Sequence, residues 1–115
     1  MIRLLLALIA VESNGNDAAV GDQGRAVGCL QIRSEVIRDV NRIYGTRFDS
    51  SHRWDREQSL RICELYLAHY AGQVRGPVTW ETYARIWNGG PSGHQKDATL
   101  RYWQKVQTEL SRPAY

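Results

Sequence analysis

The sequence contains few cysteines. Only two occur in 115 residues, Cys29 and Cys63. Two cysteines are too few for a metal site built from cysteine ligands, but they are enough for one disulfide bond. The sequence does not show whether their Cα atoms come within bonding range, so a disulfide and a pair of buried thiols both remain possible interpretations.

Histidine is also scarce, and its spacing is not that of a metal site. His52, His69 and His94 are scattered and form no pair of the His-x-x-x-His kind that binds zinc from one helix face. We therefore expect no metal. Nothing else in the sequence indicates a cofactor.

No apolar run is long enough to cross a membrane. The run from Leu4 to Val11 is far shorter than the roughly 20 residues that a spanning helix needs. Because it follows Arg3, it could be mistaken for the start of a secretory signal. The run leads straight into Glu12-Ser13-Asn14-Gly15, and cleavage within this segment would remove the candidate catalytic residue, so we interpret the run as a buried core helix of a soluble chain.

The excess of positive charge is small. Fifteen Lys and Arg residues against twelve Asp and Glu give a formal net charge of +3, which mildly favours anionic partners such as peptidoglycan, nucleic acids or lipid head groups. No run of basic residues follows one helix face, and no Cys/His finger or RNA-binding aromatic strand is present. We therefore expect no nucleic-acid partner.

Helical periodicity recurs in five segments. Ser34 is expected to cap the second helix and Asp55 the third, with Gln58 returning the capping bond to Asp55. Glycine or proline should end the helices, with Pro113 closing the last one. The predicted helices cover residues 2–13, 34–44, 55–71, 77–87 and 97–111, and the last presents Leu100, Trp103, Val106 and Leu110 on one apolar side.

Residues 14–31 lack this periodicity. They contain four glycines and two aspartates, so the segment should turn repeatedly and form at most a short hairpin. The chain is large enough to bury one core, and 43% of its residues are hydrophobic. We predict a compact, mainly α, single domain over residues 1–115, with about five or more helices and a glycine-rich loop or short hairpin after the first.

Glu12 is the candidate catalytic acid. It ends the first predicted helix on the same stripe as Leu5, Leu8 and Ile9. An apolar floor of this kind desolvates a carboxyl group and raises its pKa, which suits a proton donor. The alternative is a solvated carboxylate at a helix end without a chemical role.

Short motifs along the chain point to one family. Glu12-Ser13 ends the first helix, Gly21-Asp22-Gln23-Gly24 and Gly28-Cys29-Leu30-Gln31-Ile32 lie in the glycine-rich segment, and Trp87-Asn88-Gly89-Gly90 and Thr99-Leu100-Arg101-Tyr102-Trp103-Gln104-Lys105-Val106 follow. In this order they resemble the goose-type lysozyme and lytic transglycosylase superfamily over nearly the whole chain. The resemblance implies a lysozyme-like fold and cleavage of the β-1,4 bond between N-acetylmuramic acid and N-acetylglucosamine in peptidoglycan glycan strands.

The resemblance also assigns roles to individual residues. Glu12 matches the family's catalytic acid. The sequence departs from the family's usual pattern at Cys29-Leu30, at Trp87 and in lacking a proline after Glu12. These departures concern the expected substrate contacts and not the catalytic acid. Core packing, turn formation or a half-buried surface position is the structural alternative for the other matched residues. The candidate substrate-binding residues are Ser13, Gln31, Trp87, Asn88 and Tyr102.

Asp22 decides which reaction is expected. Hydrolysis with inversion needs a second carboxylate that activates water, and Asp22 matches an aspartate proposed to position water in goose-type lysozymes, with Asp17 in reserve. If Asp22 instead bonds to backbone N–H groups in a tight turn, Glu12 works alone. The product would then carry the 1,6-anhydromuramic end of a lytic transglycosylase. We favour hydrolysis.

Two further hypotheses belong to other classes. One is an inactive domain that binds glycan, and the other is a small helical nucleic-acid binder that rests on charge and on the helix from Ser34 to Tyr44. For the enzyme we expect a monomer that acts at the bacterial cell wall, in the periplasm or outside the cell. No leader is recognisable, so either a leader has been removed or export uses cell lysis, as for small phage endolysins, or a dedicated secretion apparatus.

Overall fold

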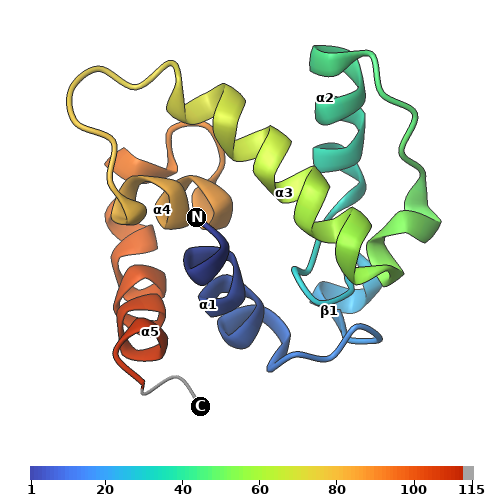
Figure 1. The fold of residues 1–115 in the computed structure, drawn as a ribbon, viewed down its shortest axis with the longest axis horizontal. Coiled ribbons are helices and arrows are strands. Elements are labelled where there is room, and N and C mark those ends of the chain that lie inside the picture. Colours follow the sequence, from blue (N-terminus) through green and yellow to red (C-terminus); the bar gives the residue numbers. More distant parts are fainter. Residues whose placement is uncertain (113–115) are drawn as a thin grey trace. The chain divides into compact units, whose positions relative to one another are not determined.

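The computed structural model describes residues 1–112 (Figure 1). These residues divide into two compact units. One consists of residues 1–11 and the described residues from 67 onward, and the other of residues 12–66. Helices α1 (Ile2–Ser13) and α3 (Arg56–Ala71) each contribute residues to both units. The single domain predicted for residues 1–115 remains a prediction.

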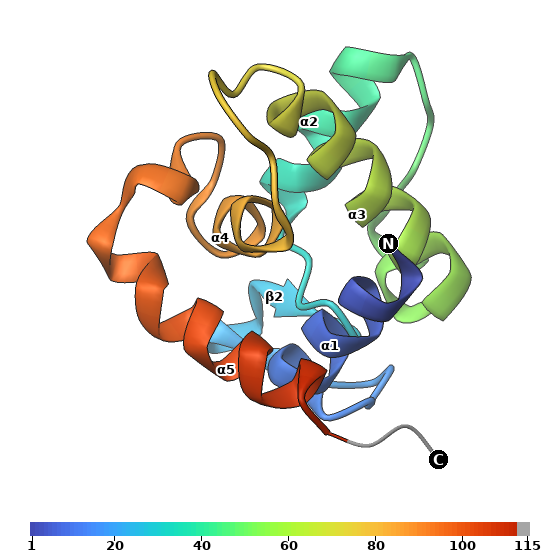
Figure 2. The ribbon, with the colours of Figure 1, turned by 60° about the vertical axis from the view of Figure 1, so that its left-hand side comes forward.

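The unit of residues 12–66 is built around a short hairpin. Strands β1 (Val20–Gly21) and β2 (Ala26–Val27) pair antiparallel, and the 3-10 turn η1 (Asp22–Gly24) joins them (Figure 2). A bridge from Val27 to Ile32 extends the pairing beyond the next turn. Helix α2 (Ser34–Tyr44) and the 3-10 turn η2 (Ser50–Trp54) follow. The core of this unit includes Val27, Cys29, Leu30, Ile32, Val40, Ile62 and Cys63.

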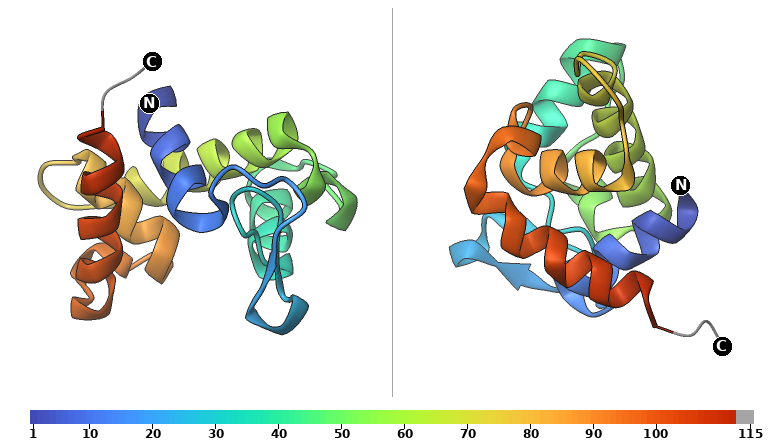
Figure 3. Two further views of the ribbon diagram at one scale, coloured as in Figure 1. Left: turned by 90° about the horizontal axis from the view of Figure 1, so that it is seen from below. Right: turned by 90° about the vertical axis from the view of Figure 1, so that its left-hand side faces the viewer.

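The other unit is helical throughout its core. Helix α4 (Trp80–Gly89) packs against the 3-10 turn η3 (Gly93–Gln95) and against α5 (Leu100–Leu110), which follows the 3-10 turn η4 (Asp97–Thr99). Nη2 of Arg3 donates to the carbonyl oxygen of Leu110 over 2.8 Å, and Figure 3 shows the first part of α1 beside α5. The core of this unit includes Leu4, Leu5, Leu8, Leu67, Ala84, Ile86 and Val106.

The predicted helices all form, and the glycine-rich segment forms the short hairpin. Gly45 and Gly90 follow α2 and α4 with φ of +67° and +88°, values that glycine adopts without steric cost. Thr79 caps α4 by exchanging bonds with Thr82. The fifth helix is shorter than predicted, because residues 97–99 form a separate 3-10 turn. Pro113, predicted to close this helix, lies outside the described residues.

Two capping predictions are wrong in detail. Arg33, not Ser34, is the N-cap of α2 and gives no side-chain capping bond; Ser34 is the first helical residue and donates to Glu35. Asp55 does accept from the backbone N–H of Gln58 over 2.9 Å. Gln58 does not return a bond to Asp55, because the backbone N–H of Asp55 already donates to the carbonyl of His52.

The apolar face predicted for α5 is also partly wrong. Leu100 is 41% exposed, whereas Val106 is buried as predicted and Tyr102, which was not predicted for this face, is buried as well. The 3-10 turn before α5 explains the difference, because Leu100 is the first residue of the helix and has no preceding α-helical turn to pack beside. Among residues 1–112, the helices are too short or too polar to cross a lipid bilayer.

Candidate active site

Glu12 lies in the last turn of α1 and is half-buried. Leu5, Leu8 and Ile9, the stripe that leads to it along the helix, are 1%, 0% and 3% exposed. The burial predicted for this stripe is therefore confirmed. A carboxyl group at such a position has one side toward protein and another toward solvent.

A thiol lies within electrostatic reach of Glu12. Cys63, on α3, is fully buried. Its burial raises the pKa of the thiol well above the usual value, and the negative charges of Glu12, Glu64 and Cys29 add to the shift. Cys63 is therefore a neutral group. Both cysteines are free thiols, so the structure contains two buried thiols instead of a disulfide.

Ser13 fixes the end of α1 to the glycine-rich segment. Its Oγ donates to the carbonyl oxygen of Cys29 over 2.8 Å. Burial raises the pKa of the Cys29 thiol, and the positive charge of the nearby Arg56 guanidinium offsets part of this rise. Ser13 thus has a structural bond that anchors the residue next to Glu12.

Asp22 occupies a turn of unusual backbone geometry. Asp22, Gln23 and Gly24 have φ of +49°, +59° and +89°, three consecutive residues in the left-handed region. The Asp22 carboxylate forms an ion pair with the guanidinium of Arg33. Among the described residues it accepts no hydrogen bond from a backbone N–H, so it does not act as a turn cap. The reserve candidate, Asp17, is bound by Arg56, with 2.9 Å between Nε and Oδ1.

Gln31 holds the hairpin together. Its Nε2 donates to the carbonyl oxygens of Ala19 and Gly28, over 3.2 and 3.0 Å. Its Oε1 lies only 2.3 Å from where a Cβ on Gly21 would stand, so a side chain at Gly21 would displace it. The amide nitrogen is therefore occupied by backbone, and a sugar contact of Gln31 would come from Oε1 or from the main chain.

The turn between β2 and α2 is anchored by Arg53. Its guanidinium donates to the carbonyl oxygen of Ile32 over 3.1 Å, to that of Arg25 over 3.4 Å and to that of Ser50 over 3.1 Å. The Arg53 carbonyl in turn accepts from Oγ of the buried Ser59 over 2.9 Å. One residue thus ties the hairpin to η2 and α3.

The other three predicted site residues lie in the other unit. Trp87 and Asn88 are in the last turn of α4, and Tyr102 is in α5. Trp87 is half-buried and Tyr102 is 8% exposed. Asn88 is exposed, and its side chain makes no hydrogen bond within residues 1–112. Of the three, the Asn88 amide is the group most available to a ligand.

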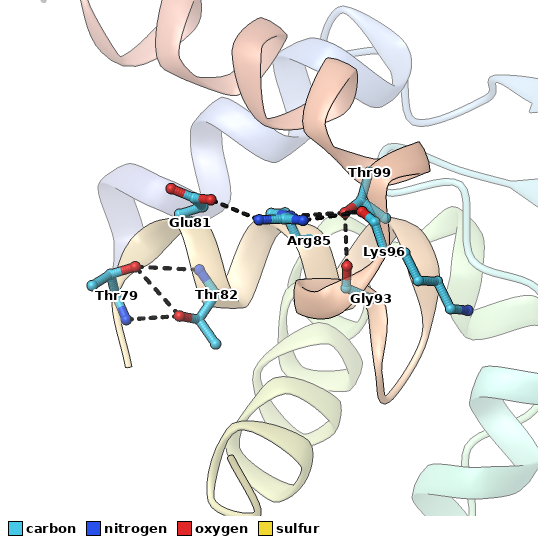
Figure 4. A network of polar contacts seen from close by, with 7 residues as sticks. All are labelled: Thr79, Glu81, Thr82, Arg85, Gly93, Lys96 and Thr99. Atoms are coloured by element: carbon cyan, nitrogen blue, oxygen red, sulfur yellow. Dashed lines mark hydrogen bonds and ion pairs between the residues drawn. The ribbon is translucent and has the colours of Figure 1, made fainter. Parts of the chain in front are cut away.

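A network of polar contacts fixes the segment that carries Asn88 (Figure 4). Arg85 donates from Nε to Oγ1 of Thr99 and from Nη1 to Oε2 of Glu81, both over 2.8 Å, and from Nη2 to the carbonyl of Lys96 over 3.0 Å. The Thr99 hydroxyl, 2% exposed, donates to the carbonyl of Gly93 over 2.7 Å. All guanidinium nitrogens of Arg85 are therefore hydrogen-bonded to residues of the same unit.

The same region depends on two close approaches. Nζ of Lys96 donates to the carbonyl oxygen of Gly89 over 2.7 Å. A Cβ on Gly89 would lie 2.5 Å from Cγ2 of Thr99, and one on Gly93 would lie 2.0 Å from the carbonyl oxygen of Arg85. Gly89 and Gly93 are therefore needed for packing, while Gly90 ends the helix.

The structure thus groups the predicted residues in two sets. Glu12, Ser13, Asp22 and Gln31 share one unit, while Trp87, Asn88 and Tyr102 share the other. Within residues 1–112, no cluster of three or more His, Cys, Asp or Glu side chains has the arrangement of a metal site.

Sequence reasoning missed the supporting arginines. Arg33, Arg53 and Arg85 bind the groups around the candidate site residues. For Arg85 the sequence offered a signal, because Thr99 is the first residue of the motif that ends at Val106, and a buried threonine hydroxyl needs a hydrogen-bond partner.

Residues 1–110 match the transglycosylase SLT domain. The chain belongs to this family. It is also similar to a lysozyme of Magallana gigas, with 48% identity over 82 residues, which cover 71% of this chain and 58% of that protein. A lysozyme of Ostrea edulis is 31% identical over 88 residues, 75% of this chain and 63% of that protein. The chain therefore spans about three fifths of the length of these two relatives.

The fold is that of a solved lysozyme. The crystal structure of Tapes japonica lysozyme superimposes with a TM-score of 0.80 and 29% sequence identity, covering 93% of this chain and 88% of that one. The predicted superfamily and the predicted lysozyme-like, mainly α fold are both confirmed by these matches.

Proposed function

We propose that the chain is a peptidoglycan muramidase that cleaves the β-1,4 bond between N-acetylmuramic acid and N-acetylglucosamine. The similarity to lysozymes and the membership of the SLT family support this reaction class. The observation that carries the proposal is the placement of Glu12. It lies in the last turn of α1, is half-buried, and lies within electrostatic reach of the fully buried thiol of Cys63.

In the proposed reaction Glu12 is the general acid. It donates its proton to the glycosidic oxygen while the bond from that oxygen to the anomeric carbon breaks. Removal of a general acid commonly lowers the rate by about 10² to 10⁴-fold.

Asp22 is proposed as the base of a hydrolytic reaction. It would take a proton from a water molecule whose oxygen bonds to the anomeric carbon, and the leaving sugar keeps the proton from Glu12. Asp22 has no hydrogen bond to the backbone of its own turn among the described residues, which speaks against the purely structural alternative.

The substrate-binding residues are proposed for each unit by itself. Asn88, exposed and without a hydrogen-bond partner within residues 1–112, offers an amide to the sugar, and Trp87 and Tyr102 lie in the same unit. In the unit of residues 12–66 we propose Ser13 and Gln31, which bond to the carbonyl oxygens of Cys29, Ala19 and Gly28. We further propose that the protein acts as a monomer at the bacterial cell wall, outside the cytoplasm.

Two measurements test the proposal. Purified chain should lower the turbidity of a cell-wall suspension, and mass spectrometry of the products should find reducing ends. Ends lighter by one water would be 1,6-anhydro ends. The reaction would then be that of a lytic transglycosylase in which Glu12 acts alone. Binding to walls without any cleavage would overturn the enzyme proposal in favour of a glycan-binding domain.

A further inference from the structure

We propose that Arg33 is a positioning residue that holds the carboxylate of Asp22 in the orientation needed for catalysis. The inference rests on the proposed function, because it assumes that Asp22 serves the reaction. The local geometry of Asp22 and Arg33 is unfavourable for both residues.

Asp22 occupies a backbone conformation that is costly for most residues other than glycine. Its φ of +49° is followed by +59° at Gln23, and glycine comes only at the third position of the run. Aspartate tolerates such a position best when its carboxylate bonds to nearby backbone N–H groups. Within residues 1–112 the Asp22 carboxylate makes no such bond, and the Arg25 N–H donates to the Asp22 main-chain carbonyl instead.

Arg33 also stands where its side chain does not help the local structure. It is the N-cap of α2, a position that favours a side chain able to accept hydrogen bonds from the first turn of the helix. An arginine side chain has no acceptor, and its positive charge lies near the positive end of the helix dipole. Arg33 gives no capping bond.

These two residues form an ion pair with each other. Both partners are exposed, with 46% of the Arg33 side chain and 37% of the Asp22 side chain accessible to solvent. Exposed ion pairs contribute little to stability, so this pair does not explain two locally unfavourable residues. Locally unfavourable geometry that no stabilising interaction offsets is typical of functional sites.

The fold keeps Arg33 in place independently of Asp22. The preceding residue, Ile32, exchanges both backbone hydrogen bonds with Val27, over 3.2 and 3.0 Å, and its carbonyl also accepts from Arg53. Nη2 of Arg33 contacts Oδ2 of Asp22, which leaves Oδ1 for a water molecule. A planar guanidinium fixes both the position and the orientation of the carboxylate more closely than an ammonium group would.

The test is a double-mutant cycle measured on cell-wall hydrolysis. Arg33→Met should lower kcat about 10-fold with little change in KM, and Arg33→Lys should recover part of the loss. In the background of Asp22→Asn, Arg33→Met should have no further effect. Arg47→Met removes the same charge from an exposed position of the same unit and should leave kcat unchanged. An equal loss with and without the Asp22 carboxylate would overturn the inference.

A second readout does not depend on activity. In NMR spectra of the intact chain, three-bond couplings should show one χ1 rotamer for Asp22 in the parent and averaging among rotamers in Arg33→Met, while amide spectra of α2 stay unchanged. An Asp22 side chain that is equally ordered without Arg33 would overturn the inference even if the chain cleaves wall. Absence of cleavage by the parent would count against the muramidase, and the couplings would still test the pair.

Discussion

The carbonyl oxygen of Arg53 lies 1.8 Å from the position that a Cβ atom would take on Gly28. No side chain fits there, and the backbone of Gly28 has φ of +86°. Arg53 is held in place by bonds from its guanidinium to the hairpin and from Ser59 to its carbonyl. The turn before Gln31 can therefore form only if the residue at position 28 is glycine.

Replacement of Gly28 by alanine should destabilise the protein strongly. The left-handed backbone costs an alanine about 1–2 kcal/mol, and the clash with the Arg53 carbonyl adds to this cost. Gly45→Ala is the matched control, because its φ is +67° and no atom lies within 4 Å of its Cβ position. Urea unfolding should show a clearly larger loss for Gly28→Ala. Equal losses would mean that the close approach is relieved without cost.

Thr99→Val should destabilise the chain by about 1–3 kcal/mol. The change keeps the shape but removes a buried hydroxyl, which leaves Nε of Arg85 and the carbonyl of Gly93 without that partner. Thr108→Val, on the exposed face of α5, removes only a bond to the carbonyl of Gln104 and serves as control. The free energy of unfolding of the two variants should differ by at least about 1 kcal/mol.

Glu12→Gln should abolish lysis and preserve binding to cell walls. The amide cannot donate the proton that the leaving sugar oxygen needs, so activity should fall by about 10² to 10⁴-fold. Glu57→Gln, at an exposed position of α3, controls for the loss of one carboxylate. Turbidity assays measure lysis and sedimentation with insoluble wall measures binding. A Gln variant as active as its parent would remove Glu12 from the mechanism.

Asn88→Ala should weaken the interaction with substrate without lowering stability. The side chain makes no hydrogen bond within residues 1–112, so the free energy of unfolding should not change. Loss of one hydrogen bond to a neutral sugar group is worth about 0.5–1.5 kcal/mol, or about 2- to 12-fold in kcat/KM. An unchanged kcat/KM would show that the amide does not touch the glycan.

Stability should fall at alkaline pH because of the two buried thiols. Burial raises the pKa of Cys63 and of Cys29 in the folded chain, so above about pH 8.5 the unfolded chain loses thiol protons that the folded chain keeps. The free energy of unfolding should then decline by up to about 1.4 kcal/mol per pH unit for each thiol. Cys63→Ala should reduce this slope in urea titrations between pH 7 and 10. If the free energy of unfolding of Cys63→Ala depended on pH as it does in the parent, the loss of stability could not be assigned to the buried Cys63 thiol.

The sequence predicted the features that depend on neighbouring residues. The periodicity of apolar residues located the helices, the glycines marked their ends, and Glu12 could be placed at the end of a buried stripe. The residue type of Ser34 predicts that it caps α2, yet pairing of Ile32 with Val27 makes Arg33 the last extended residue. Local preference gave way there to tertiary structure.

The supporting contacts could not be predicted because they join residues far apart in the chain. The guanidinium of Arg53 reaches carbonyl groups 21 and 28 residues away. Arginine is common on protein surfaces, and nothing in its local sequence distinguishes an arginine that binds main-chain carbonyls from one in solvent. The sequence does not predict whether Cys29 and Cys63 form a disulfide for the same reason, since only the fold decides whether two cysteines come within bonding range.

The bonds of Gln31 have a consequence for protein engineering. Its amide nitrogen donates to the carbonyl oxygens of Ala19 and Gly28, its Oε1 occupies the space that a Cβ on Gly21 would need, and Arg53 donates to the carbonyl oxygen of the next residue, Ile32. The hairpin is therefore not an interchangeable loop. Residues 19–32 transplanted into a related protein would lose their main support unless that protein has an arginine that matches Arg53.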